Sequence, residues 1–322
     1  NKYLQSIISP STDIIDYNFT SEQVHKLNLL QILRPDIYFN KNLSEEEFFD
    51  LSKRYYQKLI DEEIIYKSEK EYFLYRIDSE NHSQTGLISL LNIQDYINRN
   101  IKPHEKILVS KGKERADQLS KVKFQLSPIY LFYDDENIDL NLDIHHDKKP
   151  IIKFKSGKYT HSIYKTNTDF SGINFKELFV ADGHHRIEGF AQLDVDKDTK
   201  FLSIVFPKSK CLNLSYNRSI KFPKDYKKDS FLTDLKKFFH VEELKYHEKI
   251  DRFFVIYFEG KFFKIDLKDD YSTNGADWID FGEFVLKEIL NIYDETNDER
   301  VEFVPPTLGT DYLINQVDTG IT

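Results

Sequence analysis

Apolar residues recur at helical spacing near the start of the chain. Ser44 and Glu47 form a capping-box pattern, in which each side chain can bond the backbone N–H of the other residue. The apolar positions that follow are three or four residues apart: Phe48, Leu51, Tyr55 and Leu59. This spacing predicts a helix over 45–61.

Short apolar runs in the rest of the chain are typical of strands. They occupy 72–77, 86–91, 128–133 and 201–206, and Glu259-Gly260 separates two further runs as in a β-hairpin. Helical spacing returns near the end, at Phe281, Phe284, Val285 and Ile289. The mixture predicts an α/β (α+β) fold.

The stretch from Phe179 to Ala191 is the most unusual. It begins apolar and strand-like, and then five functional residues follow one another: Asp182, Gly183, His184, His185 and Arg186. After Arg186 the apolar residues recur at helical spacing. The pattern predicts a tight turn between a strand and a helix, with the charged cluster at the helix start.

Such a turn is suited to binding an anion. Gly183 permits a backbone conformation or a close approach that a side chain would prevent. The N–H groups at a helix start lack intrahelical acceptors and carry partial positive charge, to which Arg186 and a protonated imidazole add. Phosphate is the best candidate, and Asp182 is placed to hold a metal ion bridging its oxygens. The alternative is a structural turn, with Asp182 capping the helix and both histidines satisfied in the core.

Composition restricts the partners. A net charge of −9 over 322 residues argues against a general nucleic-acid partner. The single cysteine, Cys211, excludes a disulfide framework and favours a reducing cytoplasm. No apolar run approaches the roughly 20 residues needed to span a bilayer. We therefore expect a cytoplasmic protein that binds neither nucleic acid nor membrane.

One basic segment interrupts this acidic chain. Between His104 and Phe124, six Lys and Arg residues, Lys111 and Arg115 among them, face three acidic ones, which gives a local charge of +3. Most charge runs are solvated helix faces. Because the segment precedes the strand at 128–133 and the anion turn, it is also a candidate wall of the same pocket.

These motifs together resemble the domain-of-unknown-function 1015 family over nearly the whole chain. The sequence A-D-G-H-H-R at Ala181–Arg186 is close to a signature of that family. Other matching segments are Pro10–Ile15 in degenerate form, Pro103-His104-Glu105, Ser127-Pro128-Ile129, Tyr216-Asn217-Arg218 and Val317–Gly320. In the first of these, Pro-Ser-Thr stands where the family has Pro-Pro-Tyr.

A more distant resemblance is to the ParB/sulfiredoxin-type nucleotide fold, which free serine kinases share. The matching order is His104-Glu105, Arg115, Leu119, Pro128-Ile129 and Gly183–Arg186. This resemblance implies a nucleotide-binding core over 96–222, an N-terminal α/β region over 1–95 and a C-terminal α+β region over 223–322. It also implies that the Gly183–Arg186 turn binds nucleotide phosphates and that Glu105 lies at the substrate hydroxyl.

Three functions remain open. The first is a phosphotransferase that uses ATP or ADP with Mg²⁺ on a small hydroxyl compound, free serine being the best candidate. Gly183, His184, His185 and Arg186 would then bind phosphate with Lys111 and Arg115, Asp182 would hold Mg²⁺, and Glu105, His184 and His185 would be catalytic. The second is a nucleotide-binding regulatory protein, which has no need of Glu105. The third is a metal-dependent phosphohydrolase using Asp182, His184 and His185, although adjacent histidines point in different directions.

Overall fold

The computed structural model divides the chain into two compact units, Asn1–Asn213 and Leu214–Thr322. It describes residues 3–9, 22, 25–39, 42–67, 69, 71–103, 109–125, 127–135, 138, 140, 142, 144, 148–193, 196–212, 217–245, 254–271, 277–304 and 308–321. None of the helices in these ranges combines the length and apolar character needed to cross a membrane.

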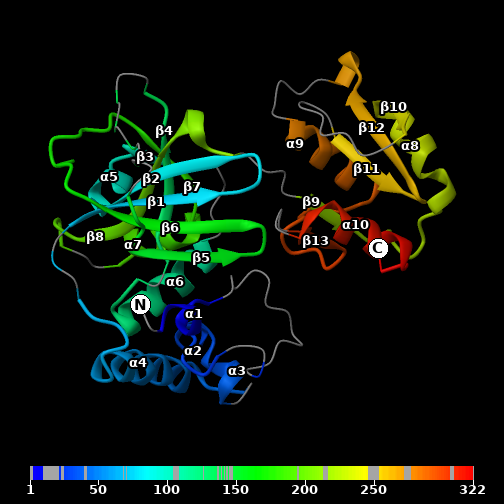
Figure 1. The fold of residues 1–322 in the computed structure, drawn as a ribbon. Coiled ribbons are helices and arrows are strands. Elements are labelled where there is room, and N and C mark those ends of the chain that lie inside the picture. Colours follow the sequence, from blue (N-terminus) through cyan, green and yellow to red (C-terminus); the bar gives the residue numbers. More distant parts are fainter. Residues whose placement is uncertain are drawn as a thin grey trace. The chain divides into compact units, whose positions relative to one another are not determined.

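An eight-stranded mixed sheet forms the centre of the first unit (Figure 1). Its strand order is β3-β7-β4-β8-β2-β1-β6-β5; the β3–β7 and β4–β8 pairs are parallel and the others antiparallel. In chain order the strands are β1 (Tyr72–Asp78), β2 (Ser83–Asn92), β3 (Ile101–Lys102), β4 (Ile129–Tyr133), β5 (Ile152–Ser156), β6 (Tyr159–Thr166), β7 (Leu178–Asp182) and β8 (Lys200–Pro207). The predicted α/β class is confirmed.

The main core lies on one face of this sheet. Helices α5 (Ile93–Ile97) and α7 (His184–Ala191) contribute Ile93, Tyr96, Ile187 and Phe190 to it. Helix α6 (Val109–Val122) packs against α7 at Gly112, where a Cβ atom would lie 2.8 Å from Glu188 Cγ. A larger residue at this crossing would require the Glu188 and Gln192 side chains to move.

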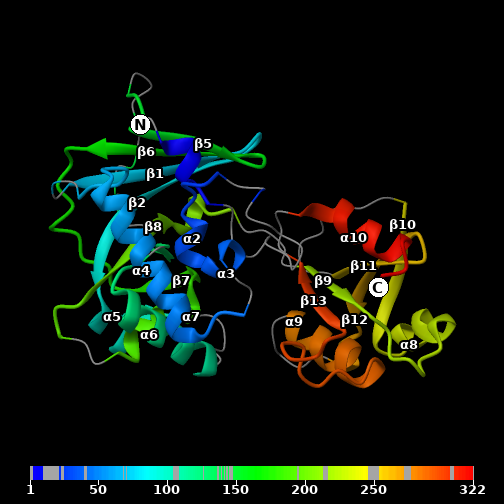
Figure 2. The same ribbon diagram turned by 90° about the horizontal axis from the view of Figure 1, so that it is seen from below.

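Four helices form a separate cluster in the same unit: α1 (Leu4–Ile7), α2 (Leu30–Leu33), α3 (Pro35–Tyr38) and α4 (Glu45–Asp61). Helices α2, α3 and α4 lie side by side in both views (Figures 1 and 2). The helix predicted over 45–61 is confirmed, and Ser44 and Glu47 form both bonds of the capping box. Its buried residues Tyr55 and Leu59 pack against Ile32.

The second unit is built on a three-stranded sheet of order β10-β12-β11, with a two-stranded sheet of β13 and β9. The predicted hairpin is β11–β12, and Glu259 and Gly260 both have positive φ, as a type I′ turn requires. The predicted helix at Phe281–Ile289, η6, has π geometry. Besides η6, the elements of this unit are β9 (Asn217–Ile220), α8 (Phe231–Phe238), β10 (Phe239–Leu244), β11 (Phe254–Phe258), β12 (Lys261–Leu267), α9 (Asp277–Asp280), β13 (Val301–Val304), α10 (Gly309–Asp318) and the short 3₁₀ segments η4 (Lys228–Ser230) and η5 (Asp269–Tyr271). The 3₁₀ segment η3 (Lys208–Lys210) belongs to the first unit.

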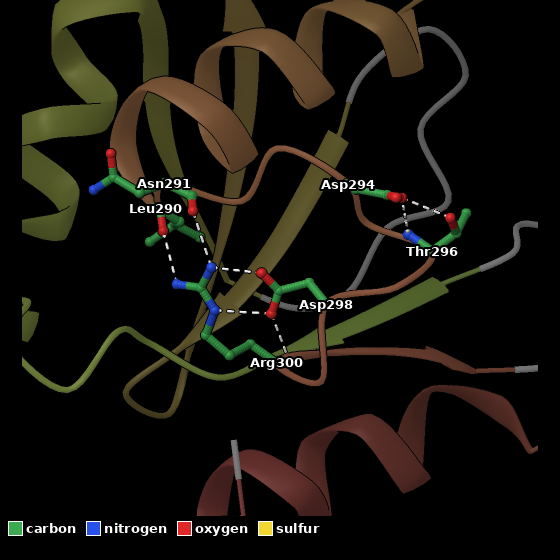
Figure 3. Close-up of polar contacts among 6 residues, drawn as sticks. All are labelled: Leu290, Asn291, Asp294, Thr296, Asp298 and Arg300. Atoms are coloured by element: carbon green, nitrogen blue, oxygen red, sulfur yellow. Dashed lines mark hydrogen bonds and ion pairs between the residues drawn. The ribbon is translucent and has the colours of Figure 1, made fainter.

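Arg300 fastens the end of η6 to the loop before β13 (Figure 3). Its guanidinium donates through Nη1 to the Leu290 carbonyl at 3.0 Å and through Nη2 to the Asn291 carbonyl at 2.9 Å. It also forms a two-point contact with Asp298, at 2.9 and 2.5 Å. The first two bonds supply donors to carbonyl groups that lack an N–H partner at the end of a helix.

The division into units differs from the three predicted regions. Strands β1 and β2, from the predicted 1–95 region, lie between β8 and β6 in the central sheet. A boundary near residue 95 would therefore cut through one hydrogen-bonded sheet. The later boundary falls after Asn213, nine residues before the predicted one after residue 222.

Candidate functional site

The stretch around Gly183 forms a strand-to-helix turn, as predicted. Strand β7 ends at Asp182, and Gly183 is the N-cap of α7 with φ +98°. The first bond of the helix runs from the Ile187 N–H to the Gly183 carbonyl at 3.0 Å. The N-cap residue, Gly183, has no side chain that could cap α7. The capping role that the structural alternative gives to Asp182 stays a prediction.

Asp182 and Arg186 form an ion pair across this turn through Arg186 Nη2 and Asp182 Oδ2. The guanidinium lies directly over Gly183, where a Cβ atom would be 3.0 Å from both Nε and Nη2. The Arg186 side chain is 28% exposed and that of Asp182 is 65% exposed. The pair is therefore accessible from solvent, and the two residues predicted to bind phosphate and metal bind each other here.

The two histidines have different environments. His184 is buried, with 7% of its surface exposed, whereas His185 is half-buried. Consecutive helical residues point in different directions, which agrees with this difference. Within the described residues, no three His, Cys, Asp or Glu side chains gather as metal ligands.

The helix that carries the basic segment lies against the helix that begins at the turn. The contact of α6 with α7 is made at Gly112, between Lys111 and Arg115 in sequence. The side chains of Lys111 and Arg115 and the whole of Glu105 fall outside the described part of the structure. The convergence of these three residues on Arg186 stays a prediction.

The carboxylate of Glu188, one turn into α7, accepts two side-chain hydrogen bonds. The Tyr96 hydroxyl donates to its Oε2 at 2.9 Å, and Gln192 donates to Oε1 at 3.0 Å. Burial and the neighbouring carboxylate raise the pKa of Tyr96. The hydroxyl therefore stays protonated and joins α5 to α7, which fixes the helix behind the turn.

Tyr130 was not among the predicted site residues, although β4 places it beside the turn. Tyr130 is the direct partner of Asp182 in the β4–β7 pair. Burial raises its pKa, and the charges of Asp182 and Arg186 act on it in opposite directions. The alternation along Ile129–Tyr133 predicts that Tyr130 and Leu131 lie on different faces of the sheet. Only the pairing of β4 with β7 shows that Tyr130 is the cross-strand partner of Asp182.

A cavity of about 370 Å³ occurs in the second unit and contains none of the predicted site residues. It is lined by α8, β10, β12 and the β11–β12 turn, with Leu232, Val241, Phe258 and Phe263 as its apolar residues. The location of the Gly183 turn in a cleft stays a prediction.

Comparison with known proteins identifies the family. The model of the family described as "Protein of unknown function (DUF1015)" matches residues 1–292. The chain belongs to the DUF1015 family. The predicted membership is thus confirmed, and no curated protein matches this DUF1015 chain.

Two solved structures are similar to this DUF1015 protein in part. One is a conserved hypothetical protein from Pyrococcus furiosus, 14% identical, with 72% of this chain and 75% of that chain covered and a TM-score of 0.32. The other is a mutant free serine kinase in complex with ADP, 13% identical, with 72% and 82% covered and a TM-score of 0.30. Scores this low carry no argument about the site.

Proposed function

We propose that this DUF1015 protein is a nucleotide-dependent phosphotransferase that acts on a small hydroxyl compound, with free serine and phosphoserine as the best candidates. The Gly183 turn carries the proposal. It combines the start of an eight-residue helix, a glycine with φ +98° and a guanidinium folded over that glycine. Phosphoryl transfer depends mainly on positioning and charge neutralisation, which such groups supply.

The turn residues would bind the nucleotide phosphates. Backbone N–H groups of His184, His185 and Arg186 point along the α7 axis toward its N-terminal end, where an anion is stabilised. The Arg186 guanidinium would bind two phosphate oxygens side by side. His185, the less buried of the two histidines, would stabilise developing charge.

Asp182 fits a magnesium site that is completed by the nucleotide. Mg²⁺ is commonly held by one or two carboxylates, water and substrate phosphates, and Asp182 is exposed enough to offer such a ligand. Its carboxylate would be shared with Arg186, since the two already form an ion pair. When bound, the ion would neutralise charge on the transferred phosphoryl group.

The remaining roles rest on the resemblance to free serine kinases. Glu105 would accept the proton of the substrate hydroxyl. Lys111 and Arg115 would attract the anionic substrate, because their helix lies against α7. The ParB/sulfiredoxin-like core belongs to the same proposal.

Calorimetry with ADP and a serine/phosphoserine exchange assay test this function. Arg186→Ala should weaken ADP binding by about 2–3 kcal/mol, roughly 30- to 150-fold, as expected for a lost charge-assisted contact. Arg76→Ala is the matched control, because Arg76 is a similarly exposed arginine paired with Asp78 in the same unit. Its ADP affinity should equal that of the parent.

Glu105→Gln separates catalysis from binding. It should leave ADP affinity unchanged and lower exchange roughly 10²- to 10⁴-fold. ADP binding without exchange in the parent protein would favour the regulatory alternative. Failure of the parent to bind either ADP or ATP, with or without Mg²⁺, would refute the proposed function.

A further inference from the structure

Strand β5 is the last strand of the central sheet, and one of its two edges is open. In the sheet order β6 is its single neighbour, and β6 is also the only described element with extensive contacts to it. The strand at the opposite end of the sheet, β3, has only two residues. Among the described residues, Ile152–Ser156 is therefore the longer of the two sheet ends to which a further strand could pair.

The turn between β5 and β6 determines which backbone groups face the open edge. This turn has two residues, so Ser156 and Tyr159, which flank it, are a hydrogen-bonded pair. Bonded and non-bonded pairs alternate along an antiparallel ladder, and the next bonded residue of β5 is Phe154. The N–H and C=O groups of Lys153 and Lys155 therefore point away from β6, to the open edge.

The two faces of β5 differ in chemistry. Lys153 and Lys155 are two residues apart, so they share a face, and both are exposed. Ile152 and Phe154 lie on the other face, where the Phe154 ring stacks on that of His161 with 4.8 Å between centroids. A strand added at the open edge would thus lie beside lysines on one face and beside apolar side chains on the other.

The surrounding hairpin is strongly basic in an acidic chain. Residues 148–165 contain six lysines and no aspartate or glutamate, whereas the whole chain has a net charge of −9. Lys165 pairs with Glu71. The other five have no carboxylate partner among the described residues and are exposed: Lys148, Lys149, Lys153, Lys155 and Lys158. The open edge therefore lies in a positive field that attracts an anionic partner.

The same lysines determine which strand can pair. Lysine on an edge strand opposes unwanted pairing. If two copies of β5 paired symmetrically, Lys153 of each would lie opposite Lys155 of the other, and like charges directly opposite are destabilising. A strand with carboxylates at these two positions would be stabilised instead. The charge of the edge disfavours a second copy of β5 and favours an acidic strand.

We propose that the open edge of β5 binds an extended acidic segment of a protein partner by strand addition. The segment would carry Asp or Glu opposite Lys153 and Lys155 and apolar residues at the alternate positions. Main-chain hydrogen bonds would supply affinity and the alternating side chains specificity. Five strands lie between β5 and β7, so this surface is separate from the Gly183 turn and does not depend on the proposed function.

Fluorescence anisotropy tests the surface with a labelled synthetic peptide in which three glutamates alternate with three valines. Lys153→Glu/Lys155→Glu should weaken binding at least tenfold. Lys197→Glu/Lys200→Glu is the matched control, because it makes the same change of charge at two exposed lysines of the same unit outside the hairpin. The control should bind within twofold of the parent. An equal loss in both variants, or no binding by the parent, would overturn the proposal.

The order of residues in the peptide distinguishes strand addition from general charge attraction. A peptide of the same composition, with its three glutamates in one block, should bind at least tenfold more weakly. Equal affinity for both peptides would overturn strand addition. Lys153→Gln/Lys155→Gln, which removes charge without reversing it, should weaken binding three- to fivefold, and its thermal midpoint should equal that of the parent because both side chains are exposed.

Amide hydrogen exchange, measured by nuclear magnetic resonance, reports the backbone contacts. In saturating peptide the N–H groups of Lys153 and Lys155 should exchange at least tenfold more slowly, while that of Phe154, already bonded to β6, should change little. Binding without this protection would show contact through side chains alone and overturn strand addition. Binding of double-stranded DNA or phosphatidylserine vesicles, lost in Lys153→Glu/Lys155→Glu and unaccompanied by peptide binding, would assign the edge to another class of partner and overturn the proposal.

Discussion

Replacing Gly183 with alanine should damage the anion site more than the fold. Two effects of the added methyl group can be separated in the structure. The first is backbone strain, because Gly183 has φ +98°, and a side chain in such a region costs roughly 1–3 kcal/mol. The second is contact with the Arg186 guanidinium, 3.0 Å from the new Cβ. Because the guanidinium ends a flexible side chain, it should move away at little energetic cost.

Gly157 provides the matched control for the backbone effect. It lies in the β5–β6 turn of the same unit with φ +56°, and nothing lies within 4 Å of the position of its Cβ. Gly157→Ala should therefore cost about 1 kcal/mol or less, since the strain is partly offset by reduced freedom of the unfolded chain. Any loss of ADP affinity in Gly183→Ala beyond that in Gly157→Ala reports the displacement of Arg186.

Urea unfolding measures the stability of both variants, and calorimetry measures their affinity for ADP. We expect Gly183→Ala to lose about 1–3 kcal/mol of stability and roughly 10- to 150-fold in ADP affinity, the range for a lost charge-assisted contact. Gly157→Ala should bind ADP as tightly as the parent. Parental ADP affinity in a folded Gly183→Ala protein would refute the placement of phosphate at this turn.

Three further predictions concern stability. Arg300→Ala should destabilise the second unit by about 2 kcal/mol, as measured by calorimetry of the whole chain, and Arg300→Lys should recover little because it lacks the planar fork. Arg300 holds the pKa of Asp298 at about 2, below its ordinary 3.8. The resulting stabilisation is complete above pH 3.8 and disappears as the pH falls toward 2, so the acid dependence of urea unfolding in this range should weaken in Arg300→Ala. Ser44→Ala should cost about 1 kcal/mol, and an unchanged urea midpoint would contradict the capping role.

Elements defined by local sequence were predicted well. The capping box at Ser44 and Glu47, the apolar spacing of α4 and the Glu259-Gly260 hairpin depend on neighbouring residues, so their sequences contain the information needed. The Gly183 turn belongs to the same group, because the change from strand to helical spacing occurs within a few residues.

Features that depend on distant residues were not predictable from one sequence. A β-bulge at Ala181 is defined only by the pairing of β7 with β4, about fifty residues earlier in the chain. Tyr130 occupies an ordinary strand pattern, and its ring lies 6.4 Å from that of Tyr75, which belongs to a strand three positions away in the sheet. The ion pair of Asp182 with Arg186 also depends on how far the guanidinium folds back over Gly183.

The strand order of the central sheet has a consequence for how the protein folds. Strand β2 can pair with β8 only after the more than one hundred residues between them have been synthesised. Strand β4 can likewise pair only after β7 and β8 have been synthesised. Contacts so distant in sequence form slowly, because a long loop must close first. During synthesis the β1–β2 hairpin therefore has an unpaired edge, which is prone to aggregation until β8 arrives.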